Sequence, residues 1–179
     1  MITVTVGTIP FQFDRIIQWL ETLLETGSIV EEVYVQYGVS NISRIEKHPL
    51  VKVAPTLERE KLFDLVKNSR LVISHAGQGS TRWLSACKAS FVIVPRLAQH
   101  REHIDDHQLS FAKSVEALGV RYCVYREELE SYILNPPAQA QGDLFSDLKL
   151  VDYLLQTYLT GPIPDELNKP GILLKGIST

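Results

Sequence analysis

Short apolar runs typical of strands alternate with helical patterns along most of this chain, and this alternation constrains its fold more than any other feature. The strand-type runs cover residues 2–6, 33–37, 51–54, 71–74, 91–94 and 121–125. Apolar residues at helical spacing lie between them, over residues 14–27, 58–68, 80–88 and 103–118. Strands that alternate with helices pair in parallel and are covered by helices on both faces. The sequence therefore predicts an α/β, Rossmann-like fold with a parallel six-stranded sheet.

Size and composition fit one such domain. The chain has 179 residues, of which 45% are hydrophobic and 22% charged, so it can bury a sizeable core. A net charge of −3 gives no basic surface for nucleic acid, and we expect no nucleic-acid partner. Cys87 and Cys123 lack metal or redox spacing and are expected to be buried thiols. Met1 leads directly into the first strand-type run without a leader pattern, so we expect a cytoplasmic protein.

The chain is expected to divide into three parts. Residues 1–135 hold the alternating pattern, and residues 136–143 form a linker rich in proline, alanine and glutamine. Residues 144–179 begin with an amphipathic helix, predicted over 144–159, and end in an irregular tail. The apolar stripe of that helix is expected to pack on the sheet or on a partner protein.

A glycine-rich turn follows the strand-type run that begins at Leu71. The sequence Leu-Val-Ile-Ser-His-Ala-Gly-Gln-Gly-Ser ends at Ser80, where a helical pattern opens. Gly77 and Gly79 have no Cβ, so a ligand can approach their backbone closely. The free N–H groups at the start of a helix favour an anion. The turn therefore predicts either a diphosphate site or a tight structural turn, and its own residues leave both interpretations open.

The remaining polar candidates also follow strands. Ligands of open parallel sheets bind beyond the carboxyl ends of the strands. Gly7 and Thr8 follow the first run, His75 follows the fourth, and Arg96 follows the fifth. For His75, a hydrogen-bonded structural role and a functional role remain equally open. The common edge predicts one ligand site for this set.

A dinucleotide-binding oxidoreductase is a weaker interpretation of the same turn. The dinucleotide fingerprint requires a third glycine, and Arg82 stands at that position. It also requires an acidic residue at the end of the next strand, where Arg96 is found. Both departures disfavour NAD.

Residues 99–108 concentrate three histidines and three carboxylates in the order Gln-His-Arg-Glu-His-Ile-Asp-Asp-His-Gln. His103 and His107 are four residues apart, a spacing at which two metal ligands share a helix face. Ile104, however, occupies the position where a zinc-protease helix carries its glutamate. We therefore expect no metal and prefer a polar site for a sugar or nucleotide. A solvated helix start would explain the aspartates without any ligand, but it would not explain His107 and Gln108 beside them.

Together these motifs resemble a known family. Residues 4–8, 73–80 and 106–108 resemble the glycosyltransferase family 28 C-terminal domain, which is the nucleotide-sugar-binding half of a GT-B enzyme. The chain is most similar to single-domain members of this family. These are the PssE-like transferases of bacterial exopolysaccharide assembly and the catalytic subunit of the two-part dolichol-linked UDP-GlcNAc transferase. Pro95-Arg96 and residues 102–108 look especially like the PssE-like group.

The resemblance implies roles for individual residues. The groups around the diphosphate of a UDP-sugar would be Gly7, Thr8, Gly77, Gln78, Gly79 and Ser80. The groups on the sugar side would be Glu102, Asp106, His107 and Gln108, with the pair His107–Gln108 contacting the sugar itself. His75 and Arg96 would stabilise the leaving group during catalysis. No metal and no further cofactor are implied.

The resemblance also implies an activity. The chain would be the catalytic subunit of a UDP-sugar-dependent inverting glycosyltransferase in polysaccharide biosynthesis. Its acceptor would be a lipid-linked saccharide, and a membrane-anchored subunit would bind that acceptor. Trp83 stands where related enzymes carry a ribose-binding glutamate, so recognition of the ribose must differ. This departure keeps open a non-catalytic role as a nucleotide-sugar-binding regulatory or scaffold subunit.

Overall fold

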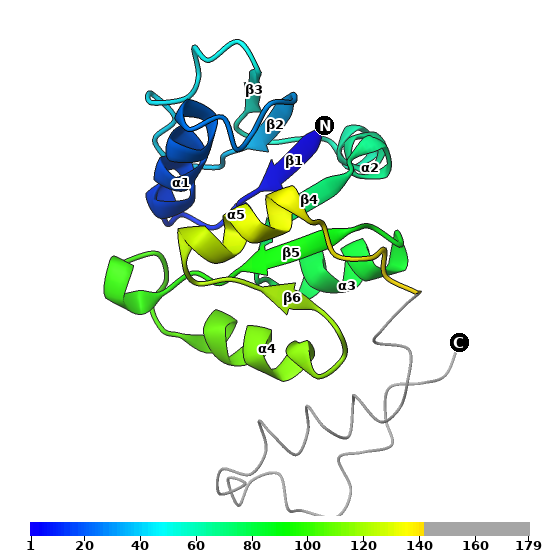
Figure 1. Cartoon of the computed structure of the whole chain (residues 1–179). Helices are drawn as coiled ribbons and strands as arrows, with labels where there is room; N and C mark the ends of the chain where they lie inside the picture. Colours follow the sequence, from blue (N-terminus) through cyan, green and yellow to red (C-terminus); the bar gives the residue numbers. More distant parts are fainter. Residues whose placement is uncertain (142–179) are drawn as a thin grey trace, which may run out of the picture. The chain divides into compact units, whose positions relative to one another are not determined.

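The computed structural model describes residues 1–141, and in this part of the chain six parallel strands form one sheet with the order β3-β2-β1-β4-β5-β6 (Figure 1). The strands are β1 (Ile2–Thr5), β2 (Val33–Gln36), β3 (Val51–Ala54), β4 (Leu71–His75), β5 (Phe91–Val94) and β6 (Arg121–Tyr122). The strand order reverses direction between β1 and β4. The predicted Rossmann-like α/β sheet is thus confirmed.

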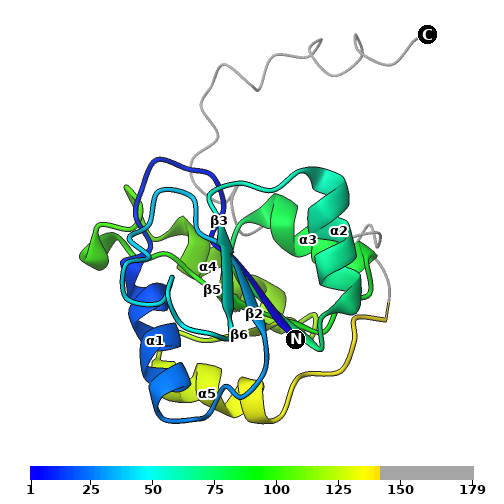
Figure 2. The same ribbon diagram turned by 90° about the horizontal axis from the view of Figure 1, so that it is seen from above.

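Helices cover both faces of this sheet. They are α1 (Asp14–Glu25), α2 (Arg59–Asn68), α3 (Gln78–Ala86), α4 (His107–Glu116) and α5 (Arg126–Leu134), with a short 3-10 helix, η1 (Ala98–His100). Figure 2 shows α1 and α5 on one side of the sheet and α2 and α3 on the other. Right-handed crossovers place α1 on one face and α2 and α3 on the other, because the chain moves one way from β1 to β2 and the other way from β3 to β4 and from β4 to β5. α5 follows β6 and belongs to no crossover between described strands.

The core lies between the central strands and α1. All four residues of β1 and of β5 are buried, as expected for parallel strands with helices on both faces. In α1, Ile16, Ile17 and Leu20 recur at helical spacing and turn one stripe toward the sheet. This packing holds the loops after β1, β4 and β5 at one edge.

The end of the described region differs from the expectation. The strand predicted over 121–125 is only two residues long, and α5, which the sequence did not indicate, begins at Arg126. The carboxylate of Glu128 accepts hydrogen bonds from the N–H groups of Val124 and Tyr125, 2.8 and 3.1 Å away, and so starts the helix. Only Leu129 and Ile133 of α5 are buried, which is too few for a clear periodic signal.

Two other helices start elsewhere than predicted. The helix expected over 103–118 begins at His107, so the residues before it form a turn. α3 begins at Gln78, two residues before the expected start at Ser80. Gly79 therefore lies in the first turn of α3 and not in the loop before it.

Residues 136–141 are tied to the sheet side of the domain. Ser90 Oγ donates a hydrogen bond of 2.6 Å to the carbonyl of Pro137, and the N–H of Ala140 donates one of 3.1 Å to the carbonyl of Ala89. These contacts hold the first part of the predicted linker against the start of β5. The helix predicted over 144–159 and the irregular tail lie outside the described residues.

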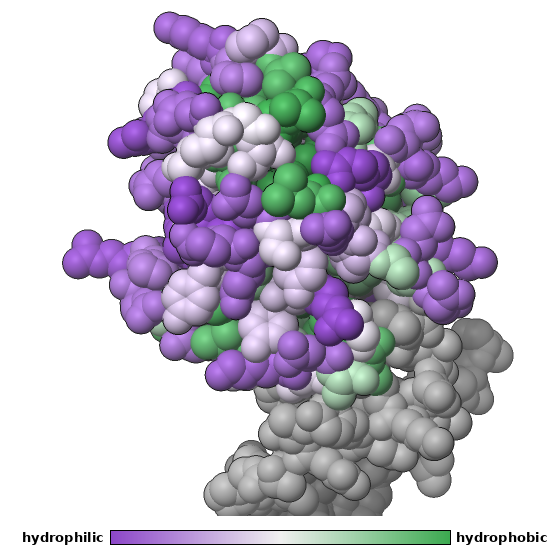
Figure 3. Space-filling model, in the orientation of Figure 1, coloured by the Kyte–Doolittle hydropathy of each residue, from purple (hydrophilic) through white to green (hydrophobic). Residues whose placement is uncertain are grey.

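Polar and charged residues cover most of the face seen in Figure 3, and apolar residues appear there in separate small areas. Within residues 1–141, none of the helices has the length and apolar character needed to cross a membrane.

Candidate functional site

Two glycine loops meet at the carboxyl edge of the sheet because β1 and β4 are neighbours. Gly7 follows β1 with a φ of +81°, a conformation that favours glycine. Gly77 follows β4, and the imidazole of His75 lies against both glycines. A Cβ on Gly7 would lie 2.8 Å from His75 Nε2, and one on Gly77 would lie 2.6 Å from it. The ring thus occupies the space that side chains at either position would need.

The imidazole of His75 is neutral at pH 7. Burial lowers its pKa from 6.5 to about 4, and the positive charge of Arg96 adds to this effect. Its Nδ1 is buried and makes no hydrogen bond within the described residues. A neutral ring between the two loops supports their geometry without adding a full positive charge to the site.

The N-terminus of α3 is free to receive an anion. Gly77 is the N-cap, no side chain caps the helix, and its first turn contains no acidic residue. Gln78 and Gly79 are exposed, and a Cβ on Gly79 would meet nothing within 4 Å. The first amides of the helix therefore face open space, which is the arrangement that binds phosphates.

Gln36, which the sequence analysis did not single out, holds the loop of Gly7. Its Oε1 accepts hydrogen bonds from Thr5 Oγ1 (2.8 Å) and from the N–H of Gly7 (3.3 Å). Its Nε2 donates to the carbonyls of Gly7 (3.1 Å) and Pro55 (2.9 Å). The available signal was an amide side chain at the end of an otherwise apolar strand, in the sequence Val-Tyr-Val-Gln.

Arg96 lies in a different environment from the one expected for direct contact with a leaving group. It is 1% exposed, and its guanidinium donates to the carbonyls of Val6 (2.7 Å), Phe11 (2.8 Å) and Glu102 (3.2 Å). The ring of Phe13 lies 4.6 Å from its Cζ. These contacts join the loop after β1 to the loop after β5, so the structure makes Arg96 a positioning residue.

Glu102 and Gln108 are buried as well, which does not fit direct contact with a sugar. Both carboxylate oxygens of Glu102 accept hydrogen bonds of 2.9 Å from the Arg15 guanidinium, and one also accepts from the N–H of Leu97. Gln108 Oε1 accepts from the N–H of Arg96 at 3.2 Å. These side chains hold the loop between β5 and α4 because they accept hydrogen bonds from other parts of the protein.

Thr8, Asp106 and His107 face solvent, as Gln78 and Gly79 do. Asp106 Oδ1 accepts a hydrogen bond of 2.8 Å from the N–H of Ala98, which leaves its other oxygen free of this contact. His107 Nδ1 contacts the carboxylate of Asp105. Of the predicted sugar-contacting pair, His107 is therefore the accessible member.

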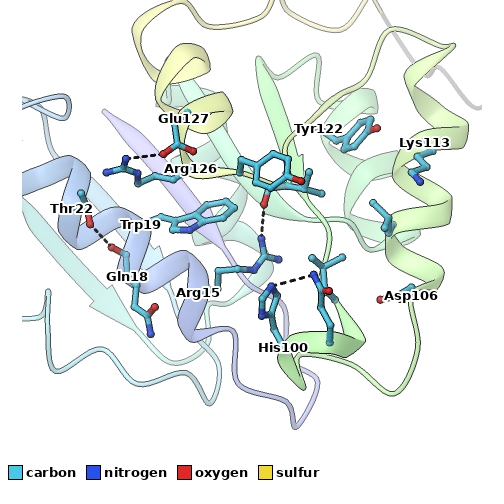
Figure 4. Close-up of a pocket in the computed structure, with 15 residues that line it drawn as sticks. Arg15, Gln18, Trp19, Thr22, His100, Asp106, Lys113, Tyr122, Arg126 and Glu127 are labelled. Atoms are coloured by element: carbon cyan, nitrogen blue, oxygen red, sulfur yellow. Dashed lines mark hydrogen bonds and ion pairs between the residues drawn. The ribbon is translucent and has the colours of Figure 1, made fainter.

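A hollow of about 910 Å³ lies beside this edge, between α1, α4 and the start of α5 (Figure 4). Arg15 and Trp19 line it from α1, Lys113 from α4 with Asp106 just before that helix, and Tyr122 from β6. The glycine loops do not line it. The N-terminal amides of α3 and the hollow are thus separate features of the described domain.

The comparisons with known proteins agree with this architecture. The family model of the glycosyltransferase family 28 C-terminal domain matches residues 1–142. None of the curated proteins compared matches the chain.

Two of the similar solved structures match most of this chain. One, described as the glycotransferase of kitacinnamycin, has a TM-score of 0.53 and 18% identity, and the match covers 87% of this chain and 38% of that one. The other, MurG from Acinetobacter baumannii, has a TM-score of 0.50 and 16% identity, and the match covers 86% of this chain and 49% of that one. The chain thus spans less than half of either structure, and at these identities the similarity shows the fold alone.

Proposed function

This chain belongs to the glycosyltransferase family 28 C-terminal domain family, and from that membership we propose that it binds the UDP-sugar donor of an inverting glycosyl transfer. The observation that carries the proposal is the uncapped N-terminus of α3, which opens beside the loop of Gly7 at the carboxyl edge of the sheet. Parallel sheets bind nucleotides at this edge, and a helix N-terminus suits a diphosphate.

In the proposed reaction the acceptor oxygen attacks the anomeric carbon of the sugar, and the bond from that carbon to the UDP oxygen breaks. Negative charge develops on the departing diphosphate. The amides of Gln78, Gly79 and Ser80 would stabilise this charge without a metal ion. Gly7 and Thr8 would approach the same diphosphate from the loop after β1. His75 and Arg96 would act by holding these loops in place.

The sugar would lie toward the start of α4. His107 is exposed there, and Asp106 leaves one carboxylate oxygen available beside it. Gln108 and Glu102 would position this segment through their buried hydrogen bonds.

The acceptor is proposed to be a lipid-linked saccharide in polysaccharide assembly. The general base and the acceptor site would come from a membrane-anchored subunit. The exposure of Gln78 and Gly79 at the start of α3 supports this proposal, because it leaves room for a partner at this edge. The match to less than half of each GT-B structure is consistent with it.

A second candidate is a non-catalytic subunit that binds a nucleotide-sugar and regulates or scaffolds polysaccharide assembly. Trp83 favours this alternative, because it is half-buried on α3 at the position where the resemblance expects a ribose-binding glutamate. Transfer by the assembled complex distinguishes the two candidates.

Donor binding is tested by thermal shift with UDP, UDP-glucose, UDP-galactose, UDP-GlcNAc, GDP-sugars and NAD. We expect UDP or a UDP-sugar to stabilise the chain by about 2.7 kcal/mol at 100 times its dissociation constant. Gly79→Val is expected to remove this shift because its side chain fills the space in front of the amides. Ala86→Val, at the other end of α3, is the matched control and should retain it. Stabilisation by NAD alone would reject the proposal.

A further inference from the structure

Two histidines and an aspartate converge in the turn before α4, apart from the glycine loops. One ring nitrogen each of His103 and His107 and a carboxylate oxygen of Asp105 all lie within 4.8 Å of one another. Both rings face the same atom: Asp105 Oδ1 is 3.3 Å from His103 Nδ1 and in contact with His107 Nδ1. We propose that these three side chains bind one divalent transition-metal ion, with Zn²⁺ as the ion to be tested.

The ligand set suits this class of ion. Imidazole nitrogen is a preferred ligand of zinc and its neighbours in the transition series, and a carboxylate oxygen completes common three-residue sites. The side chains of Asp105 and His107 are 56% and 47% exposed, so solvent can reach the centre of the cluster. A site with three protein ligands leaves a further coordination position for water.

The ring of His103 is held in place for this role. Its side chain is 14% exposed, the ring of Phe11 stacks on it at 5.7 Å, and the ring of His107 meets it edge-on at 4.4 Å. Its Nδ1 is buried and makes no hydrogen bond in the described part of the chain, although Asp105 lies close by. A buried polar atom of this kind requires a partner, and a metal ion at the centre of the cluster would supply one.

A hydrogen-bonded cluster explains the arrangement less completely. His107 and Asp105 satisfy each other, since the ring and the N–H of His107 both contact Asp105 Oδ1. His103 Nδ1 is then left without a hydrogen bond. One ion bound by two ring lone pairs and the carboxylate accounts for all three groups.

The turn also removes the zinc-protease comparison as an argument against a metal. That argument required both histidines on one helix face with a glutamate between them. Because α4 begins only at His107, the three side chains converge from a turn at alternate positions. The proposed ion would fix this turn, and no step of the proposed transfer runs through it.

Zinc binding is measured by titration calorimetry on the untagged chain, stripped with EDTA and dialysed with a phosphine reductant. We expect one ion per chain. Asp105→Asn and His107→Gln should each weaken the affinity about tenfold or more. Both residues are exposed, and an asparagine oxygen can still accept the His107 N–H, so both variants should fold. His100→Gln, an exposed histidine outside the cluster, is the matched control and should bind as the parent does.

Cobalt provides a second readout. Bound Co²⁺ should give visible absorption bands in the parent and in His100→Gln, and these bands should be lost in His107→Gln. Zinc affinity that is absent in the parent, unchanged in both cluster variants, or lost in Cys87→Ser would overturn the proposal. The measurements involve no nucleotide, so their result is independent of the proposed transfer.

Discussion

At the scale of single residues, the site depends on which glycines have other atoms where a Cβ would lie. Gly77 has the His75 ring against it, whereas Gly79 faces open space. The absence of a side chain therefore has a different structural consequence at each of the two glycines. Gly77 allows the ring to pack, and Gly79 leaves room in front of the helix amides.

Gly77→Ala and Gly79→Ala are expected to differ in stability. The new Cβ of Gly77→Ala would lie 2.6 Å from His75 Nε2, so the ring must move, and we expect a loss of about 1–3 kcal/mol. Gly79→Ala adds a helix-favouring residue in open space and should be neutral or stabilising by up to about 1 kcal/mol. Urea unfolding of both variants measures this difference. Equal losses would show that His75 does not constrain the turn.

His75 should also make stability depend on pH. Its pKa is lowered to about 4 in the folded chain, below the unfolded value of 6.5, so the unfolded chain binds more protons between these values. Stability is therefore present above pH 6.5 and is lost as the pH falls toward 4, by up to about 3 kcal/mol. His75→Gln should show a smaller fall over this range, and His100→Gln should follow the parent. Unfolding midpoints at several pH values test this expectation.

At the scale of elements, long polar side chains hold the loops of the site. Arg96 joins the loop after β1 to the loop after β5, and Arg15 of α1 joins Glu102 across 87 positions of sequence. Both guanidiniums are largely buried and donate hydrogen bonds to carbonyls or a carboxylate, although Arg96 Nε makes no hydrogen bond within residues 1–141. Such contacts fix geometry, because a fork of fixed N–H directions matches its acceptors only in one arrangement.

Arg96→Lys should destabilise the domain by about 2–3 kcal/mol, because a lysine cannot serve carbonyls in two loops at once. Arg101→Lys, an exposed arginine in the same region, is the control and should change stability little. Chemical unfolding compares the two variants. If Arg96→Lys reduced transfer while unfolding like the parent, direct contact with the leaving group would replace the positioning role.

The segment after α5 should contribute to stability as well. A chain truncated after Asn135 loses the contacts of Pro137 and Ala140 with Ser90 and Ala89. Two hydrogen bonds of this kind correspond to about 1–2 kcal/mol. A chain truncated after Gln141 retains them and serves as the control. Equal melting temperatures of the two chains would contradict this expectation.

At the scale of the whole molecule, the exposed start of α3 lies at the carboxyl edge of the sheet, and buried polar side chains hold the loops beside it. We expect the isolated chain to bind UDP but to transfer little or no sugar until the acceptor-binding subunit is supplied. Co-purification with candidate membrane proteins, followed by a transfer assay on a lipid-linked saccharide, tests this. Robust transfer by the chain alone would reject the need for a partner.

Removal of metal ions distinguishes the proposed diphosphate site from the proposed zinc site. EDTA should leave UDP affinity unchanged, because the proposed diphosphate contacts are backbone amides. The same treatment should release zinc from the cluster of His103, Asp105 and His107. Calorimetric titration with UDP before and after EDTA checks the first statement. A UDP affinity that depends on zinc would place the ion in the donor site.

Local patterns in the sequence were sufficient to predict the class of the fold and the place of the glycine turn. Strand-type runs and helical spacing are such patterns, and they predict a parallel sheet and its carboxyl edge. They were also sufficient to place Gly77 and Gly79 at that edge. Helix α5 was not predicted because its few buried residues leave no clear helical period of hydrophobic positions.

The accessibility of the polar residues at that edge depends on tertiary packing. Arg96, Glu102 and Gln108 are as polar in sequence as His107, yet their partners lie in distant loops or across the turn, and they are buried. The proximity of His103 to Asp105 and the packing of the His75 ring against Gly7 also depend on how strands and turns pack. Burial of a polar group requires a partner brought by folding, and the identity of that partner is not encoded in the local pattern.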